Sequence, residues 1–415
     1  MELQRQLEII RRGADKIVPE QELVQKLERS LRTGSPLRVK YGIDPTGIDV
    51  HLGHTVPLRK LRQFQELGHK AIIIIGNYTA LVGDPSGRDQ TRARLTPETV
   101  ETNARDYLRQ ISKIIGGLGA DGQVVDAEKV EVHRNGDWFG RMQFLDVLEL
   151  CTKMTISRLL ERDDFTKRLR AESPIYLHEC LYPLMQGWDS VEISADVELG
   201  GSEQLFSLMV ARELQRDRGQ EPQVAVTLPI LVGTDGSRRM GKSLGNYIGV
   251  ADPPDLMFGK IMSIPDACMR GYFELLTDQP LAEVDRLLAP GAHPRDAKAI
   301  LACDIVAQYY GQAAALSAQA EFERRFREHQ DPTEIPDLEI AATELKDGRL
   351  WIARLLVLLR FAPSTSEARR LVSQGGVTIG PDRLKITDPK SDIEVSHGLV
   401  VRVGNRRIAR VSLRT

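Results

Sequence analysis

Two histidines, His51 and His54, follow a turn rich in glycine and proline and are separated by one leucine and one glycine. Three kinds of chemistry compete for such a pair. A metal site needs at least one more ligand in a defined geometry, and neither an HExxH motif nor a cysteine–histidine cluster supplies it. Isolated histidines are usually structural. The third alternative is phosphate binding, because free N–H groups and the positive end of the helix dipole meet at the start of a helix.

The neighbours of the two histidines favour the phosphate site. Imidazole N–H groups donate hydrogen bonds and are weak enough bases to be neutral during a reaction. Gly53 has no side chain, so a flat adenine ring could lie against its backbone. Thr46 offers a hydroxyl group from the same turn.

A second candidate lies far downstream, in the glycine-rich segment GTDGSRRMGKSLGN at 233–246. It contains Arg238, Arg239 and Lys242 within five residues. On its own, this pattern is typical of a flexible basic surface loop. Its glycines would also allow the loop to close over a triphosphate and to open again.

The elements around the histidines place them at the edge of a sheet. Residues 37–43 are predicted as a strand, 55–70 as a helix with apolar residues three apart, and 71–76 as a strand buried on both faces. Strand, helix and strand in this order form a βαβ unit. The turn after the first strand then lies at the carboxyl end of the sheet, where open α/β sheets bind their ligands.

Composition favours an ordinary globular protein. The 415 residues are 41% hydrophobic. The longest aliphatic run, at 71–75, is far shorter than the roughly 20 residues of a membrane helix, and the charged N-terminal segment lacks a signal-peptide core. We therefore expect a cytoplasmic protein. The four cysteines are far apart, so we expect no zinc site or disulfide framework, but reduced and mostly buried side chains.

Charge is distributed unevenly along the chain. Residues 351–415 contain 12 lysines and arginines against 5 aspartates and glutamates, a net charge of +7, whereas residues 1–350 carry −9. A basic ending on an acidic body indicates a polyanionic partner, although a solvated basic face is an equal alternative.

The ordered set of motifs resembles a known family. HLGH at 51–54 and RMGKS at 239–243 resemble the two signatures of class I aminoacyl-tRNA synthetases. With IDPT at 43–46, GDPSGR at 83–88, YPLMQGWD at 182–189 and ELGGSEQ at 198–204, the whole chain looks like the longer bacterial type of tyrosyl-tRNA synthetase. HxGH alone is less specific, because other nucleotidyltransferases carry it.

The resemblance implies an α/β fold with three parts. A Rossmann-like, doubly wound parallel sheet would form the catalytic domain, followed by an α-helical anticodon-side domain and a small α+β S4-like RNA-binding domain. The expected boundaries are 1–248 for the catalytic domain, with N-terminal helices at 1–35 and a connective insertion at about 130–195, then 249–330 for the helical domain, 331–350 for a linker and 351–415 for the S4-like domain.

The resemblance also implies residue roles. The substrates would be L-tyrosine, ATP with Mg²⁺ and tRNA(Tyr), without a tightly bound cofactor or a protein-only metal site, in a cytoplasmic homodimer. The residues expected to stabilise the transition state are Thr46, His51, His54, Arg88, Arg92, Arg239 and Lys242. Those expected to bind ATP are Asp44, Gly53, Gly200, Gly201, Met240, Lys242 and Ser243.

Tyrosine recognition and RNA binding are implied in the same way. The tyrosine-binding residues would be Tyr41, Asp84, Tyr182, Gln186, Asp189 and Gln204. Tyr182, Gln186 and Asp189 are four and three residues apart, so they share one face of a helix. Asp189 would accept the phenolic hydroxyl group. The RNA-binding residues would be Arg369, Arg370, Arg406, Arg407 and Arg410.

Four positions depart from the family pattern. Arg239 replaces the first lysine of the second signature and Gly241 its third position, and Lys40 stands where many relatives have a tyrosine that helps to bind the phenol. Asn77 begins a segment in which relatives often have aspartate. The alternative functions are tryptophan activation on the same fold, a non-catalytic RNA-binding relative and a small-molecule nucleotidyltransferase.

Overall fold

The computed structural model describes residues 2–47, 50–84, 95–326, 331, 335–404 and 407–414. The chain forms two compact units, Met1–Ala315 and Leu316–Thr415, which divide within the helix α16 (Gln312–Phe326). Each unit is described by itself. No helix in the described part of the chain is long and apolar enough to cross a membrane.

A six-stranded sheet organises the first unit. Its spatial order is β1-β6-β5-β2-β3-β4, and all neighbours are parallel except β1, which runs antiparallel to β6. The strands are β1 (Lys16–Val18), β2 (Arg38–Ile43), β3 (Lys70–Ile75), β4 (Val130–Arg134), β5 (Val197–Gly201) and β6 (Val224–Leu228). The chain order reverses between β2 and β5, so the topological switch point of the sheet lies there.

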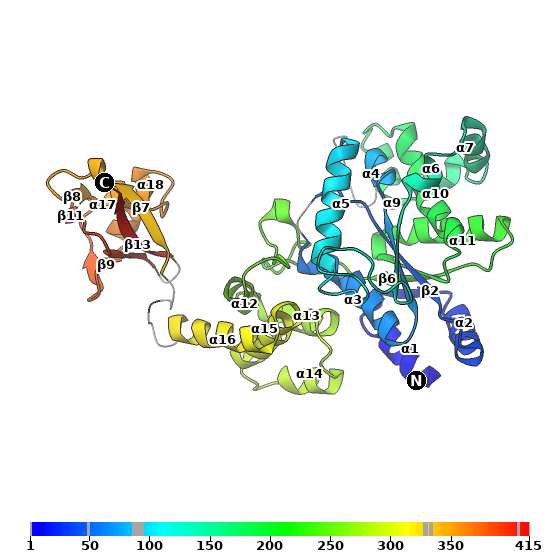
Figure 1. Ribbon diagram of the computed structural model, residues 1–415, viewed down its shortest axis with the longest axis horizontal. Helices are drawn as coiled ribbons and strands as arrows, with labels where there is room; N and C mark the ends of the chain where they lie inside the picture. Colours follow the sequence, from blue (N-terminus) through cyan, green and yellow to red (C-terminus); the bar gives the residue numbers. More distant parts are fainter. Residues whose placement is uncertain are drawn as a thin grey trace. The chain divides into compact units, whose positions relative to one another are not determined.

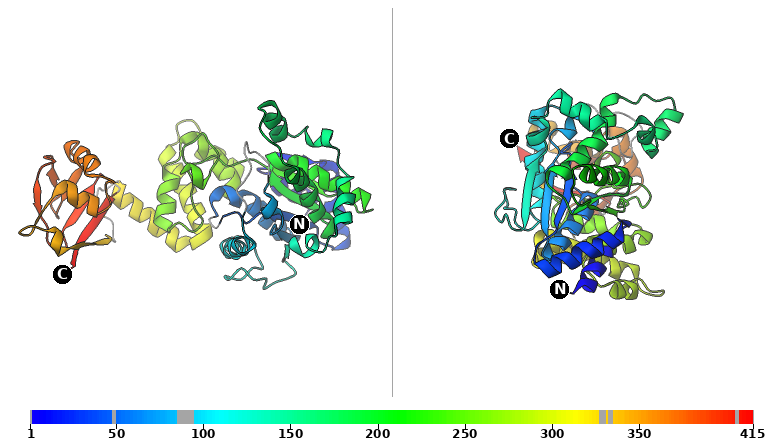
Figure 2. Two further views of the ribbon diagram at one scale, coloured as in Figure 1. Left: turned by 90° about the horizontal axis from the view of Figure 1, so that it is seen from above. Right: turned by 90° about the vertical axis from the view of Figure 1, so that its right-hand side faces the viewer.

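Helices cover both faces of this sheet. In Figure 1, α3 (Leu52–Glu66) and α5 (Pro97–Ile111) lie on one side of the strands, and α10 (Leu177–Glu192) and α11 (Leu205–Asp217) on the other. Figure 2 shows the same layers from two further directions. The run of isoleucines in β3 is fully buried between the layers, which confirms the strand expected at 71–76 and explains its unbroken apolar sequence.

The segment expected as a connective insertion differs from the structure in part. Its first residues form β4, which pairs in parallel with β3 at one edge of the sheet. Its last helix, α10, packs along α11. Between them lie the short helices α6 (Gly136–Phe139), α7 (Phe144–Cys151), α8 (Ile156–Leu159) and α9 (Asp163–Arg170). Only the residues between β4 and α10 form an insertion. β4 itself is a strand of the six-stranded sheet, because its backbone groups hydrogen-bond to β3.

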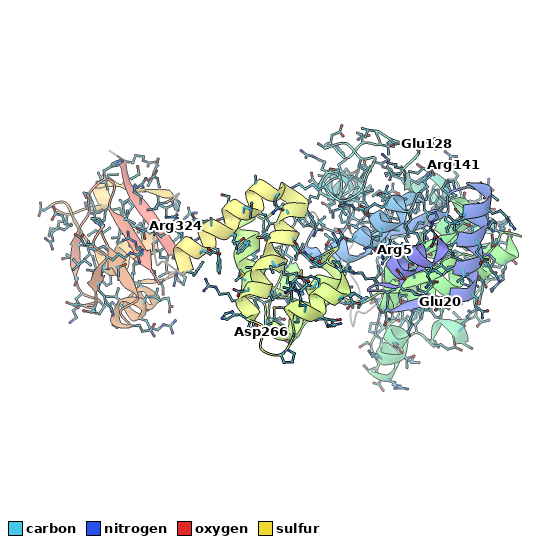
Figure 3. The ribbon with its side chains drawn as sticks, turned by 90° about the horizontal axis from the view of Figure 1, so that it is seen from below. Arg5, Glu20, Glu128, Arg141, Asp266 and Arg324 are labelled. Atoms are coloured by element: carbon cyan, nitrogen blue, oxygen red, sulfur yellow. The ribbon has the colours of Figure 1, made fainter. Side chains whose placement is uncertain are left out.

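The half-buried Arg12 and the buried Lys60 join the N-terminal helices α1 (Leu3–Arg11) and α2 (Glu20–Thr33) to the rest of the unit. Arg12 donates hydrogen bonds to four backbone carbonyl groups at the end of α13 (Met269–Leu276). Lys60 of α3 donates to the carbonyl oxygens of Ile9 and Arg12 at the end of α1. Arg5 and Glu20, labelled in Figure 3, form exposed ion pairs with Glu8 and Arg11. Such exposed pairs contribute little to stability.

The segment expected as a helical domain is helical, but its first part belongs to the same compact unit as the sheet. Its helices are α12 (Pro254–Met262), α13, α14 (Leu281–Leu287), α15 (Pro294–Tyr310) and α16. Helix α13 contacts α3, and Arg59 of α3 lies 2.6 Å from Asp278. The four cysteines of the chain are half-buried, not mostly buried as expected.

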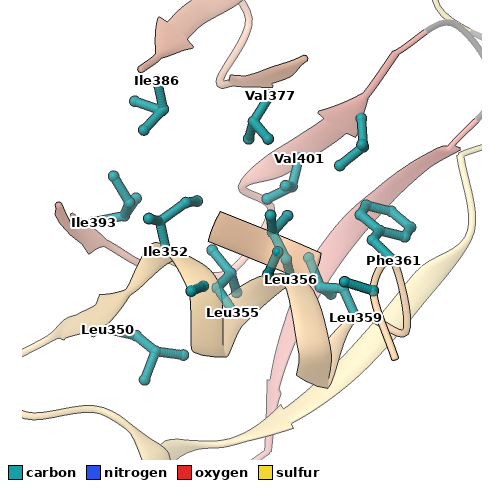
Figure 4. Close-up of a cluster of buried hydrophobic side chains, with 14 of the residues drawn as sticks. Leu350, Ile352, Leu355, Leu356, Leu359, Phe361, Val377, Ile386, Ile393 and Val401 are labelled. Atoms are coloured by element: carbon teal, nitrogen blue, oxygen red, sulfur yellow. The ribbon is translucent and has the colours of Figure 1, made fainter. Parts of the chain in front are cut away.

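The second unit has its own sheet and core. The five-stranded sheet has the order β10-β9-β12-β13-β7, and a two-stranded sheet joins β8 and β11. The strands are β7 (Asp337–Ala341), β8 (Arg349–Trp351), β9 (Val377–Ile379), β10 (Leu384–Ile386), β11 (Asp392–Glu394), β12 (Val400–Val403) and β13 (Arg407–Arg414). Two helices, α17 (Ile352–Leu358) and α18 (Thr365–Ser373), pack against each other and supply much of the apolar core (Figure 4).

The expected linker at 331–350 differs from the structure. It contains β7, which pairs in parallel with β13, and it includes the first two residues of β8. Ile340 of β7 is 2% exposed within the core of the second unit. The acidic, proline-rich composition of 331–340 is compatible with a linker or with an edge segment, and the structure has the second: β7 is the outermost strand of its sheet. Its partner is more than seventy residues further along the chain.

Candidate active site

The site forms at the carboxyl ends of β2, β3 and β5, where the switch point of the sheet lies. The loop after β2 carries Asp44, Thr46 and His51. After β3, Thr79 begins the short helix α4 (Thr79–Val82), and Asp84 follows this helix. The end of β5 carries Gly200, Gly201 and Gln204. Helix α10 adds Tyr182, Gln186 and Asp189 from above the sheet. These positions agree with the rule that open α/β sheets bind ligands at this edge.

The two histidines stack at the beginning of α3. His51 is the N-cap residue, and its ring lies 3.7 Å from that of His54 between centroids, with an angle of 18° between the planes. The His51 backbone N–H donates to Nδ1 of His54 over 3.4 Å. Nδ1 of His51 is buried and has no hydrogen-bond partner among the described residues. A buried polar atom without a partner at a helix N-terminus suits an anionic ligand.

Both imidazoles are uncharged at neutral pH. Burial lowers the pKa of His51 to about 3, helped by His54 and by the positive charge of Arg239. Desolvation by the surrounding protein lowers the pKa of His54 to about 4. Neutral rings can donate hydrogen bonds to phosphate oxygens without taking up a proton.

The glycine-rich loop at 233–246 is held by Asn246. The Asn246 side chain donates to Asp235 over 2.9 Å and to the carbonyl group of Arg239 over 3.0 Å, and it accepts from the Gly241 N–H over 2.9 Å. A side chain at Gly233 would collide with this amide, since its Cβ atom would lie 2.3 Å from Nδ2 of Asn246. The loop therefore has a defined conformation.

This loop and the histidine pair meet. The Leu52 N–H donates to the carbonyl group of Ile248 and the Val250 N–H to that of Val50, both over 2.9 Å. Met240, 5% exposed, lies against Gly53: a Cβ atom at Gly53 would be 3.5 Å from that of Met240 and 3.0 Å from the His51 ring. Two motifs that are almost 190 residues apart in the sequence thus form one wall.

The cations of the loop lie at its surface. Arg239, Lys242 and Ser243 are exposed, and the last two open the short 3-10 helix η2 (Lys242–Leu244). Arg239 is close enough to influence both His51 and Glu203 electrostatically. Arg88 and Arg92, the other expected phosphate ligands, lie outside the described residues.

A cluster of carboxylates, Asp44, Asp84 and Asp189, lies at the same edge of the sheet. Asp44 accepts hydrogen bonds from Thr79 over 2.7 Å and from the Tyr182 hydroxyl group over 2.9 Å. Burial and the charges of Asp44 and Asp84 raise the pKa of Tyr182, so its hydroxyl group keeps its proton. Thr46 turns back on the same loop, where its N–H donates to the Asp44 carbonyl group over 2.7 Å.

Asp189 is the most buried member of this cluster. Its carboxylate is 4% exposed and accepts hydrogen bonds from Nε1 of Trp138 over 3.0 Å and from Nδ2 of Asn135 over 3.4 Å. Burial raises the pKa of Asp189 to about 7, while Lys40 and the two hydrogen bonds oppose this shift. Such a carboxylate has spare lone pairs for one further donor.

Three further predicted residues, Gln204, Gly200 and Tyr41, have defined neighbours. Gln204 donates to Asp84 over 3.3 Å, and its amide oxygen accepts from the Gly201 N–H over 3.1 Å. A Cβ atom at Gly200 would lie 2.8 Å from that oxygen, so glycine is needed there. Tyr41 shares a hydrogen bond with Tyr107 of α5, and burial raises the pKa of Tyr41 well above its ordinary value.

Two positions without a sequence explanation now have one. Lys40 is fully buried and forms an ion pair with Glu198, with 2.9 Å between Nζ and Oε1. Gln186 also binds Glu198, over 3.2 Å. Asn77 accepts from the Gly136 N–H over 2.8 Å at the start of α6, so it fixes the helix that carries Trp138.

The predicted RNA-binding arginines of the second unit fall into two groups. Arg369 of α18 lies over the Trp351 ring at 4.9 Å, and Arg370 pairs with Glu367 over 2.6 Å. Arg407 donates to the carbonyl group of Phe361, whereas Arg410 faces Asp337 at 3.7 Å. Arg406 lies outside the described residues.

The sequence reading missed several residues of the pocket: Lys40 as an ion-pair partner, Thr79, Tyr107, Asn135, Trp138, Glu198 and Asn246. One signal was available for Asn135. The segment VEVHR at 130–134 alternates like a strand, and a parallel strand there would place Asn135 at the same sheet edge as Asp44.

Comparisons with known proteins agree with this geometry. Residues 32–327 match the family of class I tRNA synthetases for W and Y, and residues 350–389 match the S4 domain. The crystal structure of a C-terminally truncated mitochondrial tyrosyl-tRNA synthetase from Aspergillus nidulans shares the fold, with a TM-score of 0.61 and 22% identity over 78% of this chain and 94% of that one. Fold and site together therefore define a class I tRNA synthetase of the tryptophan and tyrosine type with an S4 domain.

Relatives in sequence narrow this class. The tyrosine–tRNA ligase of Moorella thermoacetica is 50% identical over 99% of this chain and 96% of its own length, and that of Carboxydothermus hydrogenoformans is 47% identical over 99% and 98%. The structure of the Archaeoglobus fulgidus tyrosyl-tRNA synthetase complexed with L-tyrosine has 25% identity and a TM-score of 0.60, covering 77% of this chain and all of that one. The chain belongs to the tyrosine–tRNA ligase family.

Proposed function

We propose that this site joins tyrosine to ATP and then passes the tyrosyl group to the 3′-terminal adenosine of tRNA(Tyr). The tyrosine carboxylate attacks the α-phosphate, pyrophosphate leaves, and the tRNA ribose hydroxyl then attacks the acyl carbon. The observation that carries the proposal is the contact of Gly53 with His51 and Met240, since it joins the two phosphate-handling motifs. Positioning and electrostatic stabilisation, without covalent catalysis by the protein, then account for the rate.

The nucleotide binds along the joined wall. Gly53 leaves room for the adenine, and Gly200 and Gly201 let the ribose approach the backbone. Thr46, His51 and His54 donate hydrogen bonds to the phosphates as charge moves onto pyrophosphate. Met240 packs beside the nucleotide, and Ser243 binds it from the same loop. The cations that bind the phosphates are Arg239 and Lys242 from this loop and Arg88 and Arg92 from the segment after β3. Mg²⁺ enters with ATP as part of the substrate complex.

Tyrosine occupies a pocket lined by the carboxylates Asp44, Asp84 and Asp189. Asp84, Tyr182 and Gln186 bind its ammonium group, supported by the negative charge of Asp44. Gln204 holds Asp84 in place, and Tyr41 lines the pocket. Asp189 accepts the phenolic hydroxyl group. Phenylalanine would leave this buried carboxylate without that partner, so it is rejected.

The second unit grips the tRNA. Arg370 of α18 and Arg407 of β13 both lie close to Glu367, and Arg369 is the neighbour of Arg370 on the same helix. Arg406 and Arg410 complete the proposed set of phosphate ligands. Contacts with phosphates should be salt-dependent and largely independent of sequence. We also propose that the reaction takes place in the cytoplasm.

The proposal includes a homodimer. Large apolar side chains are exposed in the stretch 144–177, among them Phe144 at 75% and Leu145 at 74% on α7. Exposed apolar side chains gathered in this way mark protein interfaces. A second copy of the chain is the proposed partner, and Leu145→Asp should shift the protein towards monomers in sedimentation velocity. A wild-type protein that sediments as a monomer would refute the dimer.

An ATP–pyrophosphate exchange assay with each of the twenty amino acids tests the reaction. Exchange with tyrosine alone is the expected result. Exchange with tryptophan would move the assignment to the sister activity of the fold. Absence of exchange with any amino acid would indicate a non-catalytic RNA-binding relative, or a nucleotidyltransferase with another acceptor.

A further inference from the structure

A fully buried lysine lies under the tyrosine pocket. Lys40 stands in the middle of β2, directly opposite Glu198 of β5, and both side chains are at most 1% exposed. Its ammonium group lies 2.9 Å from Glu198, 2.7 Å from the Gln186 carbonyl oxygen and 2.8 Å from Ser190 Oγ. Three donors thus meet three acceptors, which is the full capacity of a lysine.

Two of these acceptors bracket Asp189 on α10. Gln186 precedes Asp189 by three residues, almost one helical turn, and Ser190 follows it directly. Lys40 therefore fastens to β2 the part of the helix that carries the phenol acceptor. Glu198 extends this connection, since it also accepts from Gln186 over 3.2 Å and from Ser190 over 3.1 Å.

When Asp189 is ionised, the buried group of Lys40, Glu198 and Asp189 has one more negative charge than positive charges. Lys40 from β2 faces it with one positive charge, and Glu198 from β5 faces it with one negative charge. Its hydrogen-bond donors, Trp138 and Asn135, are neutral, and Tyr182 on the same helix is kept protonated. Removing Lys40 would leave two buried carboxylates without a cation, whereas removing the charge of Glu198 would leave Asp189 as the partner of Lys40.

We propose that Lys40, which is anchored by its ion pair with Glu198, is a positioning residue for tyrosine selection that holds Asp189 in place and whose positive charge keeps it in its ionised, hydrogen-bond-accepting form. An ionised carboxylate accepts a stronger hydrogen bond from the phenol than a carboxylic acid does. When phenylalanine binds, an ionised carboxylate without a hydrogen-bond donor costs more free energy than an unpaired carboxylic acid would. The inference rests on the proposed role of Asp189 in binding the phenol.

The two members of the ion pair give opposite expectations. In Lys40→Met, the acidic limb of the profile of kcat/KM for tyrosine against pH should move to higher pH by roughly one to three units, since this is the usual effect of a close opposite charge on a carboxylate. In Glu198→Gln the same limb should move to lower pH. At pH 7, Lys40→Met should raise KM for tyrosine, lower the preference over phenylalanine and leave KM for ATP unchanged.

Merely structural damage would reduce activity in both variants without moving the limb in opposite directions, and that result would overturn the proposal. If Lys40→Met fails to fold, the direction of the shift in Glu198→Gln decides. Lys26→Met is a matched control, because Lys26 is also buried, with 1% of its side chain exposed. Its ammonium group pairs with Asp196 at a distance of 3.1 Å, and neither residue contacts Asp189. This variant should lower stability and leave the pH profile unchanged.

Asp189→Asn separates this inference from the proposed function. If the preference for tyrosine survives in Asp189→Asn, the assignment of the phenol acceptor fails. If the preference collapses in Asp189→Asn while both ion-pair variants keep the wild-type pH profile, the assignment stands and the role of Lys40 fails.

Discussion

The rings of His51 and His54 stack with their centroids 3.7 Å apart, and the backbone N–H of the first donates to the second. The pair therefore acts as one preorganised unit at the end of the α3 dipole. Replacing His51 by alanine should lower kcat for pyrophosphate exchange by about 10²–10³-fold, which is typical for the loss of one donor to a charged transition state. His69→Gln is the control, because this histidine is equally buried but follows the C-terminal end of α3, where its ring contacts Gln6, the Leu37 N–H and Phe64. Equal losses in both variants would contradict the assignment.

Buried histidines should make the protein sensitive to acid. The pKa values of His51 and His69 are lowered to about 3 and about 4 by burial. Below pH 6.5 the unfolded chain takes up protons at these rings and the folded chain does not, so stability falls as the pH decreases. Between pH 7 and pH 5 each ring should account for a loss of about 2 kcal/mol in the free energy of unfolding.

Urea unfolding at the two pH values measures this loss. His69→Gln should show a fall that is smaller than that of the wild type by about 2 kcal/mol. An identical fall in both proteins would mean that His69 is not a source of the acid sensitivity.

Gly76 protects the geometry of Asp44. A Cβ atom there would lie 2.1 Å from the Asp44 carboxylate and 2.3 Å from the Thr79 hydroxyl group, so Gly76→Ala must displace one of them. Because small misplacements at a reacting centre have large effects on rate, kcat/KM for tyrosine should fall about 10²-fold. Gly259→Ala in α12 is the control, since nothing lies within 4 Å of its added methyl group. It should retain activity and stabilise its helix slightly. Wild-type kinetics in Gly76→Ala would refute the role of this close approach.

The pairing of β7 with β13 decides where the second unit can be removed. Deleting 351–415 leaves β7 without its partner and exposes Ile340, so that variant should aggregate. Deleting 327–415 removes the whole sheet, and this variant should be monodisperse in size-exclusion chromatography. It should keep pyrophosphate exchange and lose most tRNA charging at physiological salt. Unchanged charging would show that the second unit does not grip tRNA.

Local signals made part of this fold predictable. The unit β2–α3–β3 was predicted from its periodicity and its run of isoleucines, and both signals come from residues that touch along one element. The start of α18 is also predictable from the sequence, and the structure confirms it: the Ser364 side chain caps the helix by accepting a hydrogen bond from the Glu367 N–H. Helix α3 begins at Leu52, earlier than its apolar spacing indicated, because His51 takes the capping position.

Contacts between distant segments were not predictable in the same way. Trp138 and Asn135 bind Asp189 from 51 and 54 residues earlier in the chain, and no spacing rule connects an indole to a carboxylate at that distance. The resemblance supplied the candidate residues, but it left Lys40 and Asn77 unexplained. Their roles became visible only when the partners Glu198 and Gly136 were placed in space.

The antiparallel strand β1 has a consequence for the protein at high concentration. An open parallel sheet presents unpaired backbone groups along its outer strands, and such borders recruit strands from neighbouring molecules. Here one border consists of three residues that begin with a charged side chain, Lys16, and are followed at once by Pro19, which has no N–H to offer. The short strand thus seals that side of the sheet against fibrous self-association.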